Sequence, residues 1–244
     1  MTRSRLMSAS EVFRLGFGTI DTRAIIGGGG RSDNIIPFAL LANLPQLILS
    51  LLYFAFNGTF TAMLMGYEWI SYAHKRKGLR VSTRSHGFQR STYFLSLPYR
   101  YGLPLVVLSV TLHWIVSQCI FVVTIDIYDE FGHAVPYSSP PEGTRTCGYS
   151  PVAMVSAVIL GVFMLAAVVG FGYIPYKSGM PLAASSSLAI SAACHPDRDS
   201  EIEDIALSEQ KLQWGVVSTN EEGIGHCAFS NKEVGPLVKG RMYA

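Results

Sequence analysis

PVAMVSAVILGVFMLAAVVGFGYI, residues 151–174, decides the fold, because the stretch contains no charged side chain. A helix rises about 1.5 Å per residue and the hydrocarbon core of a bilayer is about 30 Å thick, so about 20 apolar residues suffice to cross it. Ser150 is placed to cap such a helix, and Pro151 suits its first helical position. We therefore predict a transmembrane helix over residues 151–174.

Two further stretches, residues 35–67 and 101–125, also lack Asp, Glu, Lys and Arg. The first is longer than a perpendicular crossing needs, so Pro45 should kink a long tilted helix or the last turns should emerge among the headgroups. Helices buried in a soluble bundle would carry charges on an outer face, and these stretches carry none. We expect an all-α membrane protein with three transmembrane helices and a small, partly ordered cytosolic tail.

The composition of the whole chain favours the same class. Of its 244 residues 49% are hydrophobic and 15% are charged, whereas soluble domains carry about 25% charged residues. A net charge of +2 is too small to argue for a nucleic-acid partner. Membrane lipids are therefore the expected partners, together with other membrane helices or a second copy of the chain.

The segments that connect these helices differ in charge. Residues 68–100 form a basic loop, with no acidic residue from position 74 onward, whereas residues 126–150 carry four acidic residues and one Arg. The basic residues of the loop are Lys75, Arg76, Lys77, Arg80, Arg84, Arg90 and Arg100. Short loops rich in Lys and Arg stay in the cytosol. We expect the basic loop and the tail, residues 175–244, in the cytosol, and residues 1–34 and 126–150 opposite, although residues 1–34 carry five arginines.

The basic loop admits two roles beyond its position in the chain. Topological anchoring needs no ligand. Binding of anionic lipid is compatible with anchoring, and each basic residue near a membrane surface contributes about 1 kcal/mol.

Polar side chains recur at helical spacing on the first two predicted helices. They are Asn43, Gln46, Ser50 and Asn57 on the first helix, and Ser109, His113 and Ser117 on the second. Steps of three or four residues keep them on one face, and polar groups are costly against lipid. They predict either hydrogen bonds between helices, worth about 0.6–2 kcal/mol each, or a path for a small polar solute or proton. In that path His113 would be the titratable group.

The tail has few large apolar residues, so we expect partial order. Short apolar runs near its end predict two strands with a turn around Glu222 and Gly223. The acidic residues of positions 197–209 form either a solvated linker or a partner for the basic loop. Two Cys-His pairs, 194–195 and 226–227, have the residue types of a zinc site, but adjacent residues rarely both ligate, and we expect no metal or cofactor.

Several stretches resemble a family of uncharacterised fungal multi-pass membrane proteins, whose shared region is a domain of unknown function. They include GYEWISYAHKRKGLRVS at 66–82, GFQRSTYFLSLPYRYGLPL at 87–105 and GHCAFS at 225–230. The chain is similar to the carboxyl-terminal part of these proteins, so the resemblance implies a multi-pass fungal membrane protein shortened at its amino-terminal side. It implies no activity and supplies no catalytic residues.

Three functional hypotheses follow. The first is a non-catalytic membrane module that associates with helices or lipids. The second is a component of a transporter or channel, which would need self-association because a carrier normally has more than three helices. The third is a membrane enzyme. We do not expect an enzyme, because the sequence has no GxSxG or HExxH motif and no paired intramembrane carboxylates.

Overall fold

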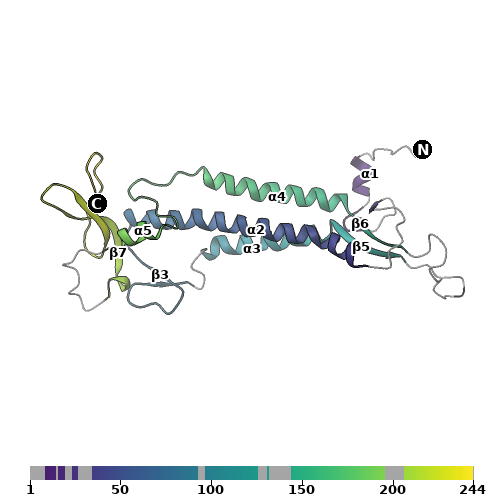
Figure 1. Ribbon diagram of the computed structural model, residues 1–244, viewed down its shortest axis with the longest axis horizontal. Coiled ribbons are helices and arrows are strands. Elements are labelled where there is room, and N and C mark those ends of the chain that lie inside the picture. The colour runs from purple at the N-terminus through teal and green to yellow at the C-terminus, as the bar shows by residue number, and fades with distance from the viewer. Residues whose placement is uncertain are drawn as a thin grey trace. The chain divides into compact units, whose positions relative to one another are not determined.

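The computed structural model describes residues 9–14, 16–19, 24–26, 35–92, 97–125, 131, 144–195 and 206–243. It divides into two compact units. The first unit comprises residues 1–56 and 104–168, and the second comprises residues 57–103 and 169–244. Three long helices, labelled α2, α3 and α4 in Figure 1, contribute residues to both units.

The three long helices are α2 (Ile36–Ile70), α3 (Tyr99–Ser117) and α4 (Pro151–Gly172). Each is long and apolar enough to cross a membrane. Their apolar side chains point outward: Phe54 is 79% exposed and Val158 is 64% exposed. Apolar surface on this scale marks a face that lipid or another protein covers.

The start of α4 follows the capping pattern predicted from the sequence. The Ser150 hydroxyl accepts a hydrogen bond from the Ala153 amide at 3.4 Å, and Pro151 is the first helical residue. The same hydroxyl accepts from the Gly18 amide at 3.2 Å and donates to the Gly16 carbonyl at 3.3 Å. The cap is therefore buried, and it joins an amino-terminal segment to α4 within the first unit.

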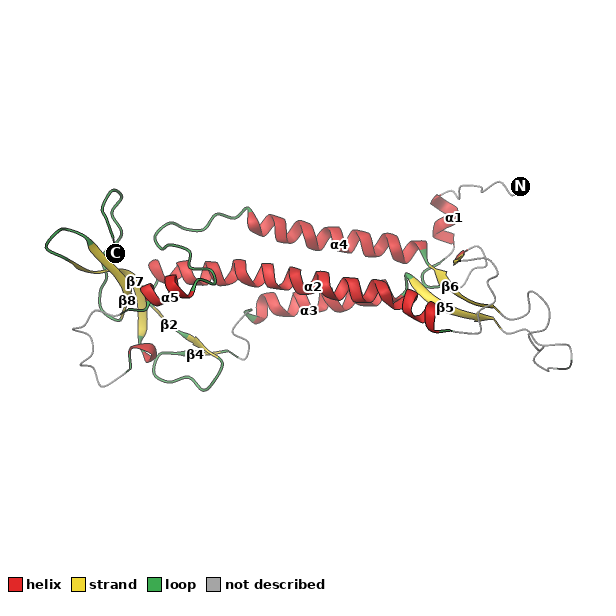
Figure 2. Cartoon of the chain, in the orientation of Figure 1, coloured by secondary structure: helices red, strands yellow, loops and turns green. Residues whose placement is uncertain are grey.

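The prediction of an all-α fold is wrong, because both units contain β-sheet (Figure 2). In the first unit β1 (Ile25–Ile26), β5 (Ile120–Ile125) and β6 (Thr144–Tyr149) form an antiparallel sheet with the order β1-β6-β5. The predicted helix over 101–125 stops at Ser117, and β5 follows after a two-residue turn. The IFVVTI sequence of β5 is β-branched and aromatic, which favours strand over helix once the chain has turned.

The second unit contains two small sheets. Strands β2 (Lys77–Gly78), β7 (Lys211–Thr219) and β8 (Gly225–Ser230) form one antiparallel sheet in the order β2-β7-β8. Strands β3 (Arg80–Val81) and β4 (Arg90–Ser91) pair in parallel. The β7–β8 hairpin confirms the two strands predicted in the tail, and its turn contains Glu222 and Gly223.

The core of the second unit joins the tail to the end of α2. Its buried residues are Tyr72, Met180, Ala193, Leu212, Trp214 and Phe229. Tyr72 belongs to the short 3-10 helix η2 (Ser71–Ala73), and Ala193 ends α5 (Ser187–Ala193). The Tyr72 and Phe229 rings meet edge to face with centroids 5.4 Å apart. The tail is thus ordered where it packs on the basic loop, since β2 of that loop pairs with β7.

The other described elements are short. Helix α1 (Ala9–Arg14) belongs to the first unit, and the 3-10 helix η4 (Leu207–Glu209) belongs to the second. Most of the predicted acidic loop at 126–150 and most of residues 1–34 lie outside the described residues.

Candidate functional site

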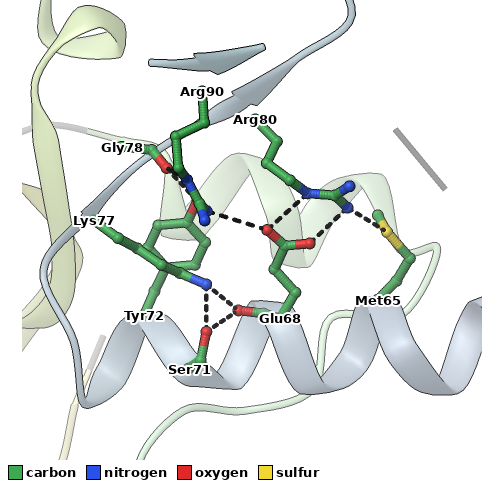
Figure 3. Close-up of polar contacts among 8 residues, drawn as sticks. All are labelled: Met65, Glu68, Ser71, Tyr72, Lys77, Gly78, Arg80 and Arg90. Atoms are coloured by element: carbon green, nitrogen blue, oxygen red, sulfur yellow. Dashed lines mark hydrogen bonds and ion pairs between the residues drawn. The ribbon is translucent and has the colours of Figure 1, made fainter. Parts of the chain in front are cut away.

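The candidate site lies at the carboxyl-terminal end of α2, where Glu68 binds the basic loop (Figure 3). Arg80 Nε donates to Glu68 Oε1 at 2.8 Å, and Arg80 Nη2 lies 2.6 Å from Oε2. The two side chains are 11% and 23% exposed, so this bidentate ion pair is largely shielded from water. Arg90 Nη2 adds a longer contact of 3.5 Å to Oε1.

The loop backbone brings both arginines to this carboxylate. Arg80 and Arg90 are direct partners in the parallel β3–β4 pair, and the Arg90 amide donates to the Leu79 carbonyl at 2.8 Å. The Arg90 Nε also donates to the Gly78 carbonyl at 3.3 Å. A Cβ atom at Gly78 would lie 1.8 Å from the Phe88 carbonyl oxygen, so only glycine permits this approach of the two loop segments.

Lys77, on β2, binds the last turn of α2. Its Nζ donates to the Glu68 carbonyl oxygen at 3.2 Å and to the Ser71 hydroxyl, and it lies 4.1 Å from the centroid of the Tyr72 ring. Carbonyl groups at a helix end lack helical partners, so a lysine that reaches them stabilises the helix end. Burial lowers the pKa of the Lys77 ammonium, and the nearby Glu68 carboxylate opposes this shift.

A cavity of about 450 Å³ opens beside Lys77 within the second unit. Its polar lining includes Lys77, Arg100 and Ser71. Its apolar lining includes Leu64, Phe171 and Ile174. The Arg100 guanidinium stacks over Tyr101, with its carbon 4.7 Å from the ring centroid. The cavity therefore combines two basic groups with an apolar wall.

The remaining predicted loop residues have other environments. The Arg76 guanidinium donates to the main-chain oxygens of Asn231 and Lys232, which fastens the loop to the tail. Lys75 and Arg84 are exposed. The structure thus gathers Lys77, Arg80 and Arg90 around Glu68 but leaves these three predicted residues elsewhere.

Of the polar side chains predicted on one face of the first two helices, Gln46 and His113 meet across α2 and α3. Gln46 Nε2 donates to the His113 carbonyl oxygen at 2.9 Å. The Oε1 atom of the same amide lies 2.9 Å from Nδ1 of the His113 imidazole. An amide oxygen only accepts, so Nδ1 carries the proton and the neutral ring has its acceptor at Nε2.

Three other members of this set bind within their own helix. Asn43, Ser50 and Ser117 donate to the main-chain oxygens of Ala39, Gln46 and Trp114, respectively. Asn57 on α2 and Ser109 on α3 are half-buried. Among the described residues the set supplies one hydrogen-bonded bridge between α2 and α3, that of Gln46 and His113.

Glu68 is the residue that the sequence reasoning missed. The sequence prediction ends the first helix at Tyr67 and places Glu68 in the loop, whereas α2 continues to Ile70. A signal was present, because Glu68 is the only acidic residue between positions 34 and 125, and seven basic residues follow it closely. A lone acid at the end of an apolar helix, before such a loop, indicates an ion pair.

The tail provides no metal site among the described residues, where no three His, Cys, Asp or Glu side chains gather. His226 Nε2 lies 3.5 Å from the His195 carbonyl oxygen, which is a contact with the main chain and not between two rings. The acidic residues 197–204, one proposed partner of the basic loop, lie outside the described residues.

Comparison with known proteins yields one match. A family model described as a domain of unknown function, DUF8419, matches residues 2–241. No curated protein and no solved structure matches the chain.

Proposed function

This chain belongs to the family described as a domain of unknown function (DUF8419), and from that premise we propose that it is an integral multi-pass membrane protein without catalytic activity. In this proposal it acts by contact with lipids and with other membrane helices. The finer elements of the proposal are a fungal origin, suggested by the sequence resemblance, and an orientation with the basic loop in the cytosol.

The observation that carries the proposal is the exposure of apolar side chains along α2, α3 and α4. Leu51, Val107 and Val158 are each between 63% and 67% exposed, on three different helices. Complete burial of one such side chain is worth about 1.5–3 kcal/mol relative to water. Helices that expose many of them are stable where hydrocarbon replaces water, and the absence of charge over residues 36–67, 101–117 and 151–172 supports lipid contact.

The ion-pair cluster supports the proposed orientation and a non-catalytic role. The Glu68 carboxylate binds Arg80 and Arg90, and Lys77 binds main-chain and hydroxyl oxygens, so these groups fix the loop against the end of α2. A basic loop held at a helix end is typical of the cytosolic membrane surface. In this proposal the cluster orders the loop against the end of α2.

Alkaline carbonate extraction tests membrane integration. Membranes from cells that express the full chain are washed at high pH and then floated in a density gradient. We expect the chain in the washed, floating membrane fraction and its release only by detergent. Recovery of the chain in the carbonate supernatant would contradict the proposal.

A second candidate, transport of a proton or small polar solute, is favoured by the Gln46–His113 pair. Its imidazole has an acceptor nitrogen, Nε2, beside a fixed Nδ1 hydrogen bond, which suits proton exchange. Vesicles containing the full chain test it. A pH-dependent flux that His113→Gln removes and Ser117→Ala preserves would support transport, and an equal flux in vesicles without protein would exclude it.

A further inference from the structure

We propose that the cavity beside Lys77 binds an anionic phospholipid, with the lipid phosphate at Lys77 and Arg100 and the start of an acyl chain along Leu64, Phe171 and Ile174. This inference rests on the proposed membrane location and adds a defined ligand site to it.

Lys77 has the donor geometry that a phosphate requires. An ammonium group has three N–H donors, and two of them reach the Glu68 carbonyl oxygen and the Ser71 hydroxyl. Lys77 also lines the cavity, and the proposal assigns the third N–H to a phosphate oxygen there. Burial lowers the pKa of Lys77, and a phosphate close to it would restore the charged form, so binding and protonation favour each other.

Arg100 supplies the second positive group. Its guanidinium lies over the Tyr101 ring, and none of the described acidic side chains pairs with it. Guanidinium binds phosphate oxygens in a bidentate arrangement, and stacking on an aromatic ring holds its plane while the edge N–H groups remain directed outward.

The Glu68 carboxylate also borders the cavity, and it would repel a phosphate if it were unpaired. Arg80 and Arg90 neutralise it by direct contact. Four basic side chains against one carboxylate leave the region strongly positive. The ion pairs of Glu68 therefore hold the loop in place without reversing the sign of the cavity.

The apolar lining identifies lipid, not free phosphate, as the source of the anion. Leu64, Phe171 and Ile174 come from the ends of α2 and α4 and the residues just after α4, where the proposed hydrocarbon region ends. Ile174 is 51% exposed. A cavity of about 450 Å³ has the size of a small-molecule site, about 300–1,000 Å³. Such a mixed lining fits a molecule with a phosphate at one end and a hydrocarbon chain at the other.

The test measures phosphatidylserine retained by the full chain in detergent, by native mass spectrometry, with phosphatidylcholine as the neutral lipid. The test variant is Lys77→Gln with Arg100→Gln, and the matched control is Lys75→Gln with Arg84→Gln, which removes the same charge from exposed positions of the same loop. A second variant, Arg100→Gln alone, leaves Lys77 and its bonds to α2 intact.

We expect the wild-type chain and the control variant to retain phosphatidylserine in preference to phosphatidylcholine. Loss of each cavity cation should weaken retention about fivefold, and loss of both about twenty-five-fold. Arg100→Gln alone should weaken retention about fivefold, and because it leaves the bonds of Lys77 to α2 in place, it keeps the test valid if the double variant fails to fold. Addition of inorganic phosphate should displace little of the lipid.

Equal losses in the test and control variants would show binding by loop charge alone and would overturn the site. Equal retention of both lipids, or full displacement by inorganic phosphate, would overturn the assignment to anionic lipid. Carbonate extraction of the wild-type chain separates the two claims, because a chain that stays in the membrane yet retains no phosphatidylserine contradicts this inference alone.

Discussion

Glu68 and Arg80 form a bidentate ion pair, with Arg80 Nε 2.8 Å from Oε1 and Nη2 2.6 Å from Oε2. Twelve residues separate them in the chain, and the pair fixes the start of the basic loop to the end of α2. A loop that the sequence identifies by charge alone is therefore an ordered element. Its cations have individual structural roles in addition to any effect on topology.

Glu68→Gln should destabilise the second unit. The substitution leaves the shielded Arg80 guanidinium without its counter-charge, and we expect a loss of about 1–3 kcal/mol in the free energy of unfolding. Thermal unfolding of the full chain in detergent measures the change. Glu221→Gln, in the exposed hairpin turn, is the control and should change stability by less than about 0.5 kcal/mol. Equal effects of the two substitutions would contradict the role of the ion pair.

Gly78→Ala should disrupt the basic loop. The new Cβ would lie 1.8 Å from the Phe88 carbonyl oxygen, so β2 and the following loop segment must separate. Faster proteolysis of the second unit and a lower melting temperature are expected. Gly58→Ala is the matched control, because a Cβ there meets no atom within 4 Å, and alanine raises helix propensity by about 1 kcal/mol. A Gly78→Ala chain as resistant as the control would refute the close approach.

The contribution of Lys77 should depend on pH. Burial lowers the pKa of Lys77 in the folded chain, so the unfolded chain binds more protons between the folded pKa and the ordinary lysine pKa of 10.5. Stability from this group therefore rises as pH increases through that window.

The difference in melting temperature between the wild-type chain and Lys77→Gln measures this effect. We expect the difference to move in favour of the wild-type chain as the pH increases from 7 toward 10.5. Lys75→Gln, at an exposed position, serves as the control and should show no such trend. A difference that is constant with pH would exclude the lowered pKa.

Gln46 and His113 should be energetically coupled. A double-mutant cycle of Gln46→Ala and His113→Ala removes hydrogen bonds that join α2 to α3, and the expected coupling is about 0.6–1.7 kcal/mol. Asn43→Ala with His113→Ala is the control cycle, because Asn43 binds its own helix at Ala39. The control pair should be additive. A coupling no larger than that of the control would mean that the amide bridge adds no stability.

Ser150→Ala should destabilise the first unit by about 1 kcal/mol or more, because it removes the cap of α4 and the contacts to Gly16 and Gly18. Ser156→Ala is the control, since its hydroxyl donates only to the Val152 carbonyl of its own helix. Thermal unfolding compares the two variants. An effect of Ser150→Ala as small as that of Ser156→Ala would contradict the joint role of the hydroxyl.

The positions of the long helices were predictable, because a stretch of about 20 apolar residues without charge has the length of a helix that crosses the hydrocarbon core of a bilayer. The predicted start of α4 agrees with the structure, whereas α2 begins one residue later and ends three residues later than predicted. The β5 strand was not predictable in this way, since IFVVTI continues the apolar run of α3 without a charge to mark the change. The prediction extended the helix to residue 125 because the residues are apolar, although the β-branched residues of IFVVTI favour a strand.

The candidate site was predicted in part. The density of charge identifies the basic residues, but their arrangement depends on the parallel β3–β4 pair. Strands of two residues have no recognisable sequence pattern. Glu68 was recognisable as the only acid of its region. The short apolar runs of the tail predict its hairpin, whereas its packing on Tyr72 depends on contacts between distant segments.

The most direct test of the account is photocrosslinking at Phe54, the most exposed aromatic side chain of α2 at 79%. The residue is replaced by p-benzoylphenylalanine in the full chain, and membranes are irradiated and analysed for covalent lipid adducts. The same replacement at Phe88, 60% exposed in the basic loop, is the control. The account predicts adducts with acyl chains at position 54 and few at position 88. Position 54 without lipid adducts, or with no more than position 88, would contradict the claim that these helices contact hydrocarbon.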